Sequence, residues 1–335
     1  MTEPTQSFAQ ASALPTLADV RAAAERIRGK AIRTPLIRSA LLDELTGATV
    51  FLKPECLQRT GSFKFRGAYN AVSSLSVAER AHGIFACSSG NHAQGVAEAA
   101  RLLGAAATII MPSDAPTIKR QRTEAMGAKV VTYDRATEDR DALTRAAAEA
   151  VGGSIVHPYE NLKVIAGQGT IGLEVVEDLA ALGLQPEAVF VCCGGGGLTA
   201  GVSLGIKDQV PTAEIYTVEP AGFDDTARSL AAGERLGNAH PSGSICDALL
   251  AQRPGETSFA VNRTRISRGL VVTDEEALAA VGFAARELKL VAEPGGAVAL
   301  AALLTGKVDV RGKVVVAVIS GGNIDPAVMT RALAS

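Results

Sequence analysis

The sequence lacks an excess of either charge and lacks long apolar runs. Lysine and arginine number 33 against 35 aspartates and glutamates, with no basic stripe or acidic tail, so nucleic acid is not expected as a partner. No apolar run approaches the ~20 residues that a membrane helix requires, and the first residues show neither the basic nor the apolar stretch of a leader. We therefore expect a cytoplasmic protein without a membrane partner.

Cysteine and histidine are also scarce. The five cysteines, an odd number, show no C-x-x-C pair and no zinc-ligand spacing, and the four histidines are scattered. The sequence therefore indicates neither a disulfide framework nor a structural metal held by these residue types. Only His92 lies inside a motif.

Short β-branched runs alternate with alanine-rich helical patterns along the 335 residues. Continuously apolar strands separated by helices are typical of parallel sheets covered on both faces, which predicts an α/β fold. With 47% hydrophobic residues, the chain can fill two domains or one large unit. A helix capped by Thr16, with Asp19 in its first turn, is expected near the start. The runs interpreted as strands lie at 107–112, 129–134, 187–193, 213–220 and 313–320.

Four polar or glycine-rich loops each follow an apolar or strand-like stretch. Ligands of parallel α/β sheets collect at the carboxyl ends of strands, so loops far apart in the sequence can form one site. We expect these loops to converge. They are "TGSFKFRG" (60–67), "CSSGNHAQG" (87–95), "CCGGGGLTAG" (192–201) and "ISGGNID" (319–325).

The loop formed by Gly194, Gly195, Gly196 and Gly197 is the most informative. It follows an apolar run and precedes a helical pattern, so its backbone N–H groups and the helix dipole suit a phosphate. A tight strand-to-helix turn is the alternative, but it would need one or two glycines rather than four, each costing about 0.5–1 kcal/mol in conformational entropy. Neither G-x-G-x-x-G nor a P-loop motif fits.

A phosphate site without a nucleotide motif, together with Lys64 between two glycines, directs attention to pyridoxal phosphate, whose aldehyde bonds to a lysine. The motifs "GSFKFRGA", "SSGNHAQG", "VIAGQGTIGLE", "GGGGL", "VEP" and "SGGN", in this order, resemble those of the fold-type II pyridoxal phosphate enzymes, specifically the serine/threonine dehydratase and serine racemase family. The resemblance implies a tryptophan synthase β-like fold and a homodimer. It also implies a large domain (1–76 and 160–335) and a small domain (77–159), each with a mainly parallel sheet, and a cofactor between them.

The resemblance also assigns roles. Lys64 would hold the cofactor covalently and then move the Cα proton, and Phe63 would line the cofactor pocket. Asn91 would bind the cofactor's 3′-hydroxyl, and the loop with Ser88, Ser89, Asn91 and His92 would bind the substrate carboxylate. Ser89 would lie on the cofactor face opposite Lys64 and act there as a second base. A lone histidine opening a helix is more often structural, which is the interpretation we favour for His92.

On the other side of the cofactor, the resemblance places Gly194, Gly195, Gly196, Gly197 and Leu198 around the phosphate. Ser320 would face the pyridine nitrogen. A neutral hydroxyl there weakens electron withdrawal by the ring, which suits expulsion of a β-hydroxyl group.

The stretch "VEPAGFDD" resembles the metal site of the same family. Glu219, the Phe223 carbonyl and Asp225 are the candidate ligands, and hard oxygens of this kind suit Mg²⁺, Mn²⁺ or Ca²⁺. A strand end followed by an acidic turn is the alternative interpretation.

The resemblance implies a dehydratase that converts L-threonine or L-serine to a 2-oxo acid and ammonia. Serine racemase is an alternative that depends on Ser89. A second alternative is 3-hydroxyaspartate dehydratase, which requires an added cation for the β-carboxylate that the sequence does not locate. A pyridoxal phosphate carrier without catalysis is disfavoured, because Lys64, Ser89 and the carboxylate loop are all present.

Overall fold

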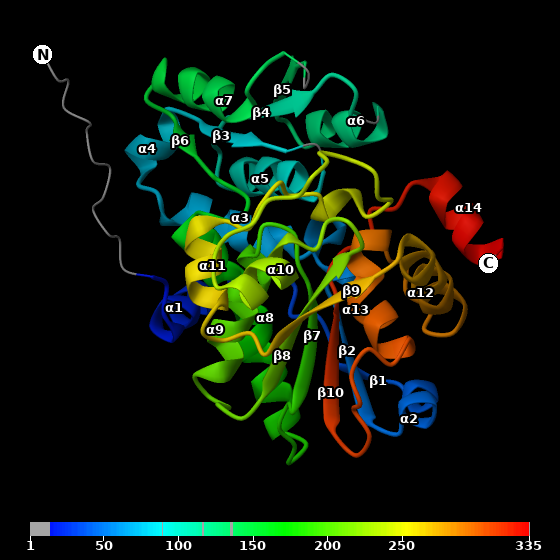
Figure 1. Ribbon diagram of the computed structural model, residues 1–335. Helices are drawn as coiled ribbons and strands as arrows, with labels where there is room; N and C mark the ends of the chain where they lie inside the picture. Colours follow the sequence, from blue (N-terminus) through cyan, green and yellow to red (C-terminus); the bar gives the residue numbers. More distant parts are fainter. Residues whose placement is uncertain (1–13, 89, 116, 135–136, 335) are drawn as a thin grey trace, which may run out of the picture.

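The computed structural model describes residues 14–88, 90–115, 117–134 and 137–334, and these form two sheets with helices on their faces (Figure 1). The first sheet has the order β1 (Ile37–Arg38), β2 (Thr49–Pro54), β10 (Val314–Ile319), β7 (Ala188–Cys192), β8 (Glu214–Pro220) and β9 (Arg268–Val272). The second has the order β5 (Lys129–Tyr133), β4 (Ala107–Pro112), β3 (Ile84–Cys87) and β6 (Ser154–Ile155). The predicted α/β fold is confirmed, and all five runs interpreted as strands are strands.

Both sheets are mainly parallel, as expected for strands separated by helices. In the six-stranded sheet, β1 pairs antiparallel with β2 at the edge, while β2, β10, β7, β8 and β9 pair in parallel. In the four-stranded sheet, β5, β4, β3 and β6 are all parallel. The carboxyl ends of the strands within each sheet therefore lie along one edge.

The helices that precede residue 151 are α1 (Leu17–Ile27), α2 (Ala40–Thr46), α3 (Lys64–Ser74), α4 (Val77–Ala81), α5 (Asn91–Leu102), α6 (Thr117–Ala125) and α7 (Arg140–Glu149). Those that follow are α8 (Leu162–Ala180), α9 (Gly197–Lys207), α10 (Asp225–Ala232), α11 (Glu256–Asn262), α12 (Asp274–Arg286), α13 (Pro294–Leu304) and α14 (Pro326–Ala334). Single 3₁₀ turns are η1 (Glu55–Leu57), η2 (Arg59–Gly61) and η3 (Asp247–Leu249). The predicted Thr16 cap is confirmed, because the Asp19 N–H donates to Thr16 Oγ1 at 3.3 Å and Asp19 Oδ2 accepts from the Thr16 N–H at 3.0 Å.

The largest core lies on both faces of the six-stranded sheet. Apolar residues of α8 and α9 pack on one face, and α13 packs on the other (Figure 1). In the four-stranded sheet, α5 covers one face and α7 the other. All four strands of this second sheet fall within 77–159, the predicted small domain, whose boundaries stay a prediction. No helix in the described part of the chain is both long and apolar enough to cross a membrane.

A cluster of buried charges fixes the start of α3. The Arg66 guanidinium is fully buried and donates to Glu55 at 2.8 Å and to Glu174 at 2.6 Å. Lys53, also fully buried, donates to Glu174 at 2.6 Å and to the Thr34 carbonyl at 2.7 Å. Two cations and two carboxylates thus pair within one cluster that joins β2, α3 and α8, two residues from Lys64.

Candidate active site

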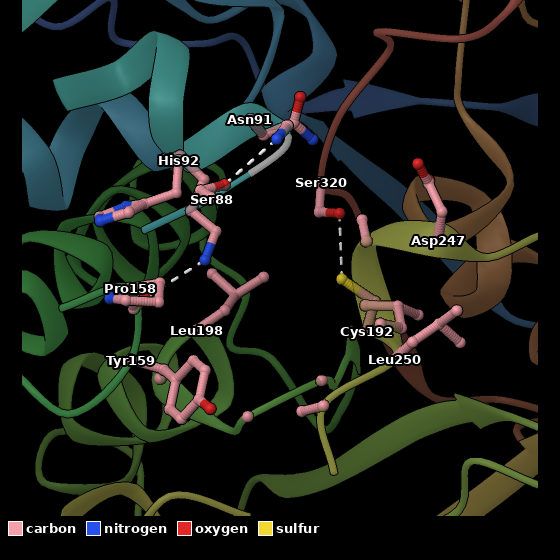
Figure 2. Close-up of a pocket in the computed structure, with 18 of the residues that line it drawn as sticks. Ser88, Asn91, His92, Pro158, Tyr159, Cys192, Leu198, Asp247, Leu250 and Ser320 are labelled. Carbon is pink, nitrogen blue, oxygen red and sulfur yellow. Dashed lines mark hydrogen bonds between the residues drawn. The ribbon is translucent and has the colours of Figure 1, made fainter. Parts of the chain in front are cut away.

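The four loops singled out in the sequence meet around one cavity of about 190 Å³ (Figure 2). Phe63 and Lys64 come from the first loop, and residues of 87–92 span the end of β3 and the start of α5. Residues 192–198 run from the last residue of β7 into α9, and Ser320 follows β10, so the cavity lies at the carboxyl ends of strands from both sheets. In Figure 2, Ser88 and His92 lie on one side of the cavity, and Cys192 and Asp247 lie on the other.

Lys64 is the first residue of α3 and carries an amine suited to proton transfer. The Phe63 N–H donates to the Ser320 carbonyl at 3.0 Å, which ties the start of α3 to the end of β10. Lys64 Nζ donates to the Pro158 carbonyl at 3.2 Å and lies 5.1 Å from the centroid of the Phe63 ring. Burial lowers the pKa of Lys64 to about 8, so a neutral amine is accessible near physiological pH.

The glycine loop leaves no room for side chains. A Cβ on Gly195 would lie 2.5 Å from the Tyr159 ring, and one on Gly197 would lie 2.8 Å from the Tyr159 Cα. Gly196 adopts φ +89°, a left-handed conformation that favours glycine, and α9 begins at Gly197. A backbone cradle at a helix N-terminus, in the same cavity as the half-buried Lys64 amine, fits the phosphate and aldehyde of pyridoxal phosphate.

The stretch from Ser88 to the first turn of α5 adds polar groups to the cavity lining. The Ser88 N–H donates to the Ile110 carbonyl at 3.1 Å, and Ser88 Oγ accepts from the Gly90 N–H at 3.1 Å. Ser89, the predicted second base, lies outside the described residues. His92 lines the cavity, its Nε2 lies 2.8 Å from the Val156 carbonyl, and burial lowers its pKa to about 3. A ring that stays neutral and contacts a backbone carbonyl supports the structural interpretation of His92.

Both the nitrogen and the oxygen of the Asn91 side-chain amide form hydrogen bonds. Asn91 Nδ2 donates to Glu293 Oε1 at 2.5 Å, and Asn91 Oδ1 accepts from Asn323 Nδ2 at 2.7 Å. The second N–H of Asn91 Nδ2 can still serve a ligand, so its predicted roles toward the cofactor hydroxyl and the substrate stay predictions.

Ser320 directly follows β10 and lines the cavity. The Cys192 thiol donates to Ser320 Oγ at 3.0 Å (Figure 2). Because the serine oxygen already accepts this hydrogen bond, its own hydroxyl hydrogen is available to an acceptor in the cavity. That arrangement is compatible with the predicted contact to an unprotonated pyridine nitrogen.

Sequence reasoning missed several charged residues that line the cavity: Lys119 of α6, Arg140 at the start of α7, Asp247 of η3 and Glu293 before α13. Lys119 and Asp247 form an ion pair, Arg140 pairs loosely with Asp141 at 3.7 Å, and about half of the Arg140 side chain remains exposed, at 47%. In the sequence, Lys119 and Arg140 are ordinary charges in helices rich in charge. Glu293 directly precedes Pro294, and a proline at a helix start was a local signal that could have marked Glu293 as a helix-capping position.

Glu293 gives the site a pH dependence that can be measured. Burial raises its pKa to about 7, so its contribution to stability is present below about pH 4.5 and is lost as the pH rises through 7. We expect Glu293→Gln to match the native protein at pH 4.5 and to exceed its thermal midpoint at pH 8, because the amide never has to ionise. Thermal unfolding at both pH values tests this, and an equal difference between the two proteins at both pH values would contradict it.

The predicted metal-ligand side chains lie near the end of β8, at Glu219, and at the start of α10, at Asp225. Glu219 and Asp225 are fully buried, and Glu219 accepts the N–H groups of Thr226 at 2.9 Å and Ala227 at 2.7 Å. Asp225 Oδ1 accepts from Asn238 at 2.7 Å, while Asp225 Oδ2 is buried without a hydrogen-bond partner. Burial raises the pKa of Asp225 to about 6 and that of Glu219 well above its ordinary value. A buried carboxylate pair with an unsatisfied oxygen fits a hard cation.

Among the described residues, no group of three or more His, Cys, Asp or Glu side chains is placed to hold a metal. The predicted third ligand is the Phe223 carbonyl, and the Phe223 side chain is buried. Cys193 directly precedes the glycine loop, and its Sγ lies 3.3 Å from Thr226 Oγ1, so the acidic segment and the glycine loop are structurally linked.

Comparison with known proteins gives a family match over most of the chain. Residues 27–321 match the family model described as pyridoxal-phosphate dependent enzyme. An L-threo-3-hydroxyaspartate ammonia-lyase from Pseudomonas sp is 44% identical over 92% of this chain and 95% of its own length. The L-threonine ammonia-lyase of Thermotoga maritima is 41% identical over 94% of this chain and 77% of its own. The structure of maize serine racemase has 32% identity and a TM-score of 0.90, covering 96% of this chain and 98% of the other.

Proposed function

The chain belongs to the pyridoxal-phosphate dependent enzymes, and on that premise we propose that it is an ammonia-lyase of 3-hydroxy amino acids that prefers L-threo-3-hydroxyaspartate. The observation that carries the substrate preference is the presence of Arg140 and Lys119 in the same cavity as Lys64. These side chains supply the cation that a β-carboxylate needs.

The cofactor would be held by residues on two sides of the cavity. Lys64 would bond to its aldehyde, the glycine loop and Leu198 would surround its phosphate, and Phe63 and Ser320 would contact its ring. When bound, pyridoxal phosphate accepts electrons from the Cα of the substrate and thereby makes the Cα proton acidic.

The side chains of this chain account for substrate binding and proton movement. The N–H groups at the start of α5, with Ser88 and Asn91, would bind the α-carboxylate at a helix N-terminus. The Lys64 amine, once released from the cofactor, can take the Cα proton, because its depressed pKa keeps a neutral fraction available at pH 7–8. Loss of the β-hydroxyl followed by hydrolysis then yields a 2-oxo acid and ammonia.

Arg140 is the stronger candidate for the β-carboxylate. Its guanidinium can form two parallel hydrogen bonds to a carboxylate, and its own ion pair with Asp141 is a loose one of 3.7 Å, whereas Lys119 is tightly paired with Asp247. The Lys119–Asp247 pair also supports a second candidate function, elimination from L-serine or L-threonine, because a neutral substrate side chain would leave that pair intact.

We expect Arg140→Met to lower kcat/KM for L-threo-3-hydroxyaspartate by about 10- to 100-fold, the effect of losing a charge-assisted pair worth about 1.5–3 kcal/mol. Because serine has no second carboxylate, kcat/KM for L-serine should change less than about 3-fold. Steady-state assays of ammonia release on both substrates measure the two values.

Arg145→Met, on the same helix but outside the cavity lining, is the matched control and should affect neither substrate. A parallel loss on both substrates in Arg140→Met would assign Arg140 to cofactor binding or folding. Unchanged kinetics on hydroxyaspartate would remove it from the site.

We extend the proposal to a divalent cation, Mg²⁺, Mn²⁺ or Ca²⁺, at Glu219, Asp225 and the Phe223 carbonyl. Chelation with EDTA should lower the thermal midpoint, and added Mg²⁺ or Mn²⁺ should restore it, because a ligand that binds only the native state stabilises it. Asp225→Asn should make the midpoint insensitive to both treatments. An unchanged midpoint in the native protein would leave the segment as an acidic turn.

The racemase interpretation depends on Ser89 and stays a prediction. So do the homodimer, the cytoplasmic location and the division into domains 1–76 with 160–335 and 77–159. Serine racemisation by the purified protein, and its loss in Ser89→Ala with elimination retained, would support the second base.

A further inference from the structure

Two buried polar side chains of α11 contact the back of the glycine loop. Ser258 Oγ donates to the Gly195 carbonyl at 2.5 Å, and Asn262 Nδ2 donates to the Gly196 carbonyl at 3.2 Å. Their exposed fractions are 0% and 1%, and both lie behind the loop rather than in the cavity lining. One turn of helix separates them, so α11 presents both donors to successive peptide groups of the loop.

The direction of these carbonyls fixes the direction of the N–H groups that follow. In a trans peptide the C=O of one residue and the N–H of the next point in opposite directions. With the carbonyls of Gly195 and Gly196 turned toward α11, the N–H groups of Gly196 and Gly197 are turned away from it, toward the cavity. The Gly196 carbonyl also accepts from the Ala200 N–H at 2.9 Å, which starts α9.

Glycines by themselves do not select this orientation, because they adopt positive and negative φ with similar ease. The same carbonyls receive further support, since the Gly255 N–H donates to the Gly195 carbonyl at 3.0 Å and Thr199 Oγ1 donates to the Gly196 carbonyl at 2.8 Å. We propose that Ser258 and Asn262 are positioning residues that lock the peptide groups of the glycine loop in the orientation that binds the cofactor phosphate.

Helix α11, which carries the two positioning residues, is itself held in place by a residue next to the cavity lining. The Glu160 carboxylate accepts the N–H groups of Glu256 and Thr257, the latter at 2.8 Å, and so fixes the start of α11. Glu160 directly follows Tyr159, whose ring packs against Gly195. Because neither Ser258 nor Asn262 lines the cavity that receives the ring, these two side chains should influence cofactor affinity through the phosphate.

The test compares a cofactor that has the phosphate with one that lacks it. The purified full-length protein is dialysed against graded concentrations of pyridoxal 5′-phosphate or of pyridoxal, and occupancy is measured by visible absorbance. Ser258→Ala and, separately, Asn262→Leu should each weaken pyridoxal phosphate binding by about 10-fold, equivalent to about 1.4 kcal/mol. Pyridoxal binding should change less than about 2-fold, because pyridoxal has no phosphate to place.

Ser203→Ala is the matched control, since Ser203 is equally buried on α9 but its hydroxyl donates to the Ala200 carbonyl at 2.8 Å, away from the loop. It should alter neither affinity. Equal losses of both cofactors in the α11 variants would show a general structural role and overturn the proposal, as would unchanged affinity for pyridoxal phosphate. Because occupancy is measured without substrate, the outcome is independent of which amino acid the enzyme uses.

Discussion

Lys64→Ala should lose the visible absorbance of the bound cofactor and lower ammonia release at least ~10³-fold, because no other group in its loop carries an amine. The chain supplies the environment for this amine through burial, the Pro158 carbonyl and the Phe63 ring. Borohydride reduction of the native protein, followed by peptide mapping, should place the cofactor on Lys64. The measurements are the absorption spectrum and an ammonia assay on the same purified samples.

Lys163→Ala is the control for this prediction. Lys163 is a half-exposed lysine, with 47% of its side chain accessible, and it forms a loose ion pair of 3.8 Å with Asp19. The control should keep the spectrum and the activity. If Lys64→Ala retained the visible band, with reduction fixing the cofactor on another lysine, the assignment of this cavity as the active site would fail.

Arg66→Met should give the largest loss of stability that we predict, about 3–5 kcal/mol of unfolding free energy. The substitution keeps the apolar volume but leaves Glu55, which is fully buried, without its cationic partner, and leaves Glu174 with Lys53 alone. Because the cluster anchors the start of α3, cofactor occupancy should also fall. Urea unfolding followed by circular dichroism measures the change in free energy.

Arg311→Met tests whether loss of any arginine ion pair has the same effect. Arg311 pairs with Asp309 at 2.7 Å, but both side chains are largely exposed, at 78% and 65%. Water replaces the lost contact there, so the unfolding midpoint should not move. Similar losses in both variants would refute the argument that burial makes the Arg66 cluster critical.

Local patterns in the sequence predicted most of the fold and the loops of the site. The parallel strands are continuous apolar runs because both faces are covered, and the loops with Lys64, the four glycines and Ser320 follow strands whose ends lie at one edge. The Thr16 cap depends on residues three positions apart, so it too was visible. Each of these features is specified by neighbours in the chain.

The charged lining of the cavity could not be predicted in this way. Lys119 and Arg140 reach the cavity only because α6 and α7 flank the four-stranded sheet, and nothing in their own helices distinguishes them from solvated charges. This explains why the cation needed for a β-carboxylate could not be located in the sequence. Likewise, Ser258 and Asn262 act through the backbone of a loop more than 60 positions away, as the separations of 63 and 66 residues show.

The most direct test of the central claim is to incubate the purified protein, loaded with pyridoxal phosphate, with L-threo-3-hydroxyaspartate, L-serine and L-threonine and to measure ammonia and 2-oxo acid together. The proposal predicts equal amounts of the two products, with the highest kcat/KM on L-threo-3-hydroxyaspartate and lower values on L-serine and L-threonine. Highest activity on serine or threonine would contradict the assigned preference. Absence of ammonia from all three substrates, in protein whose visible absorbance shows bound cofactor, would contradict the ammonia-lyase itself.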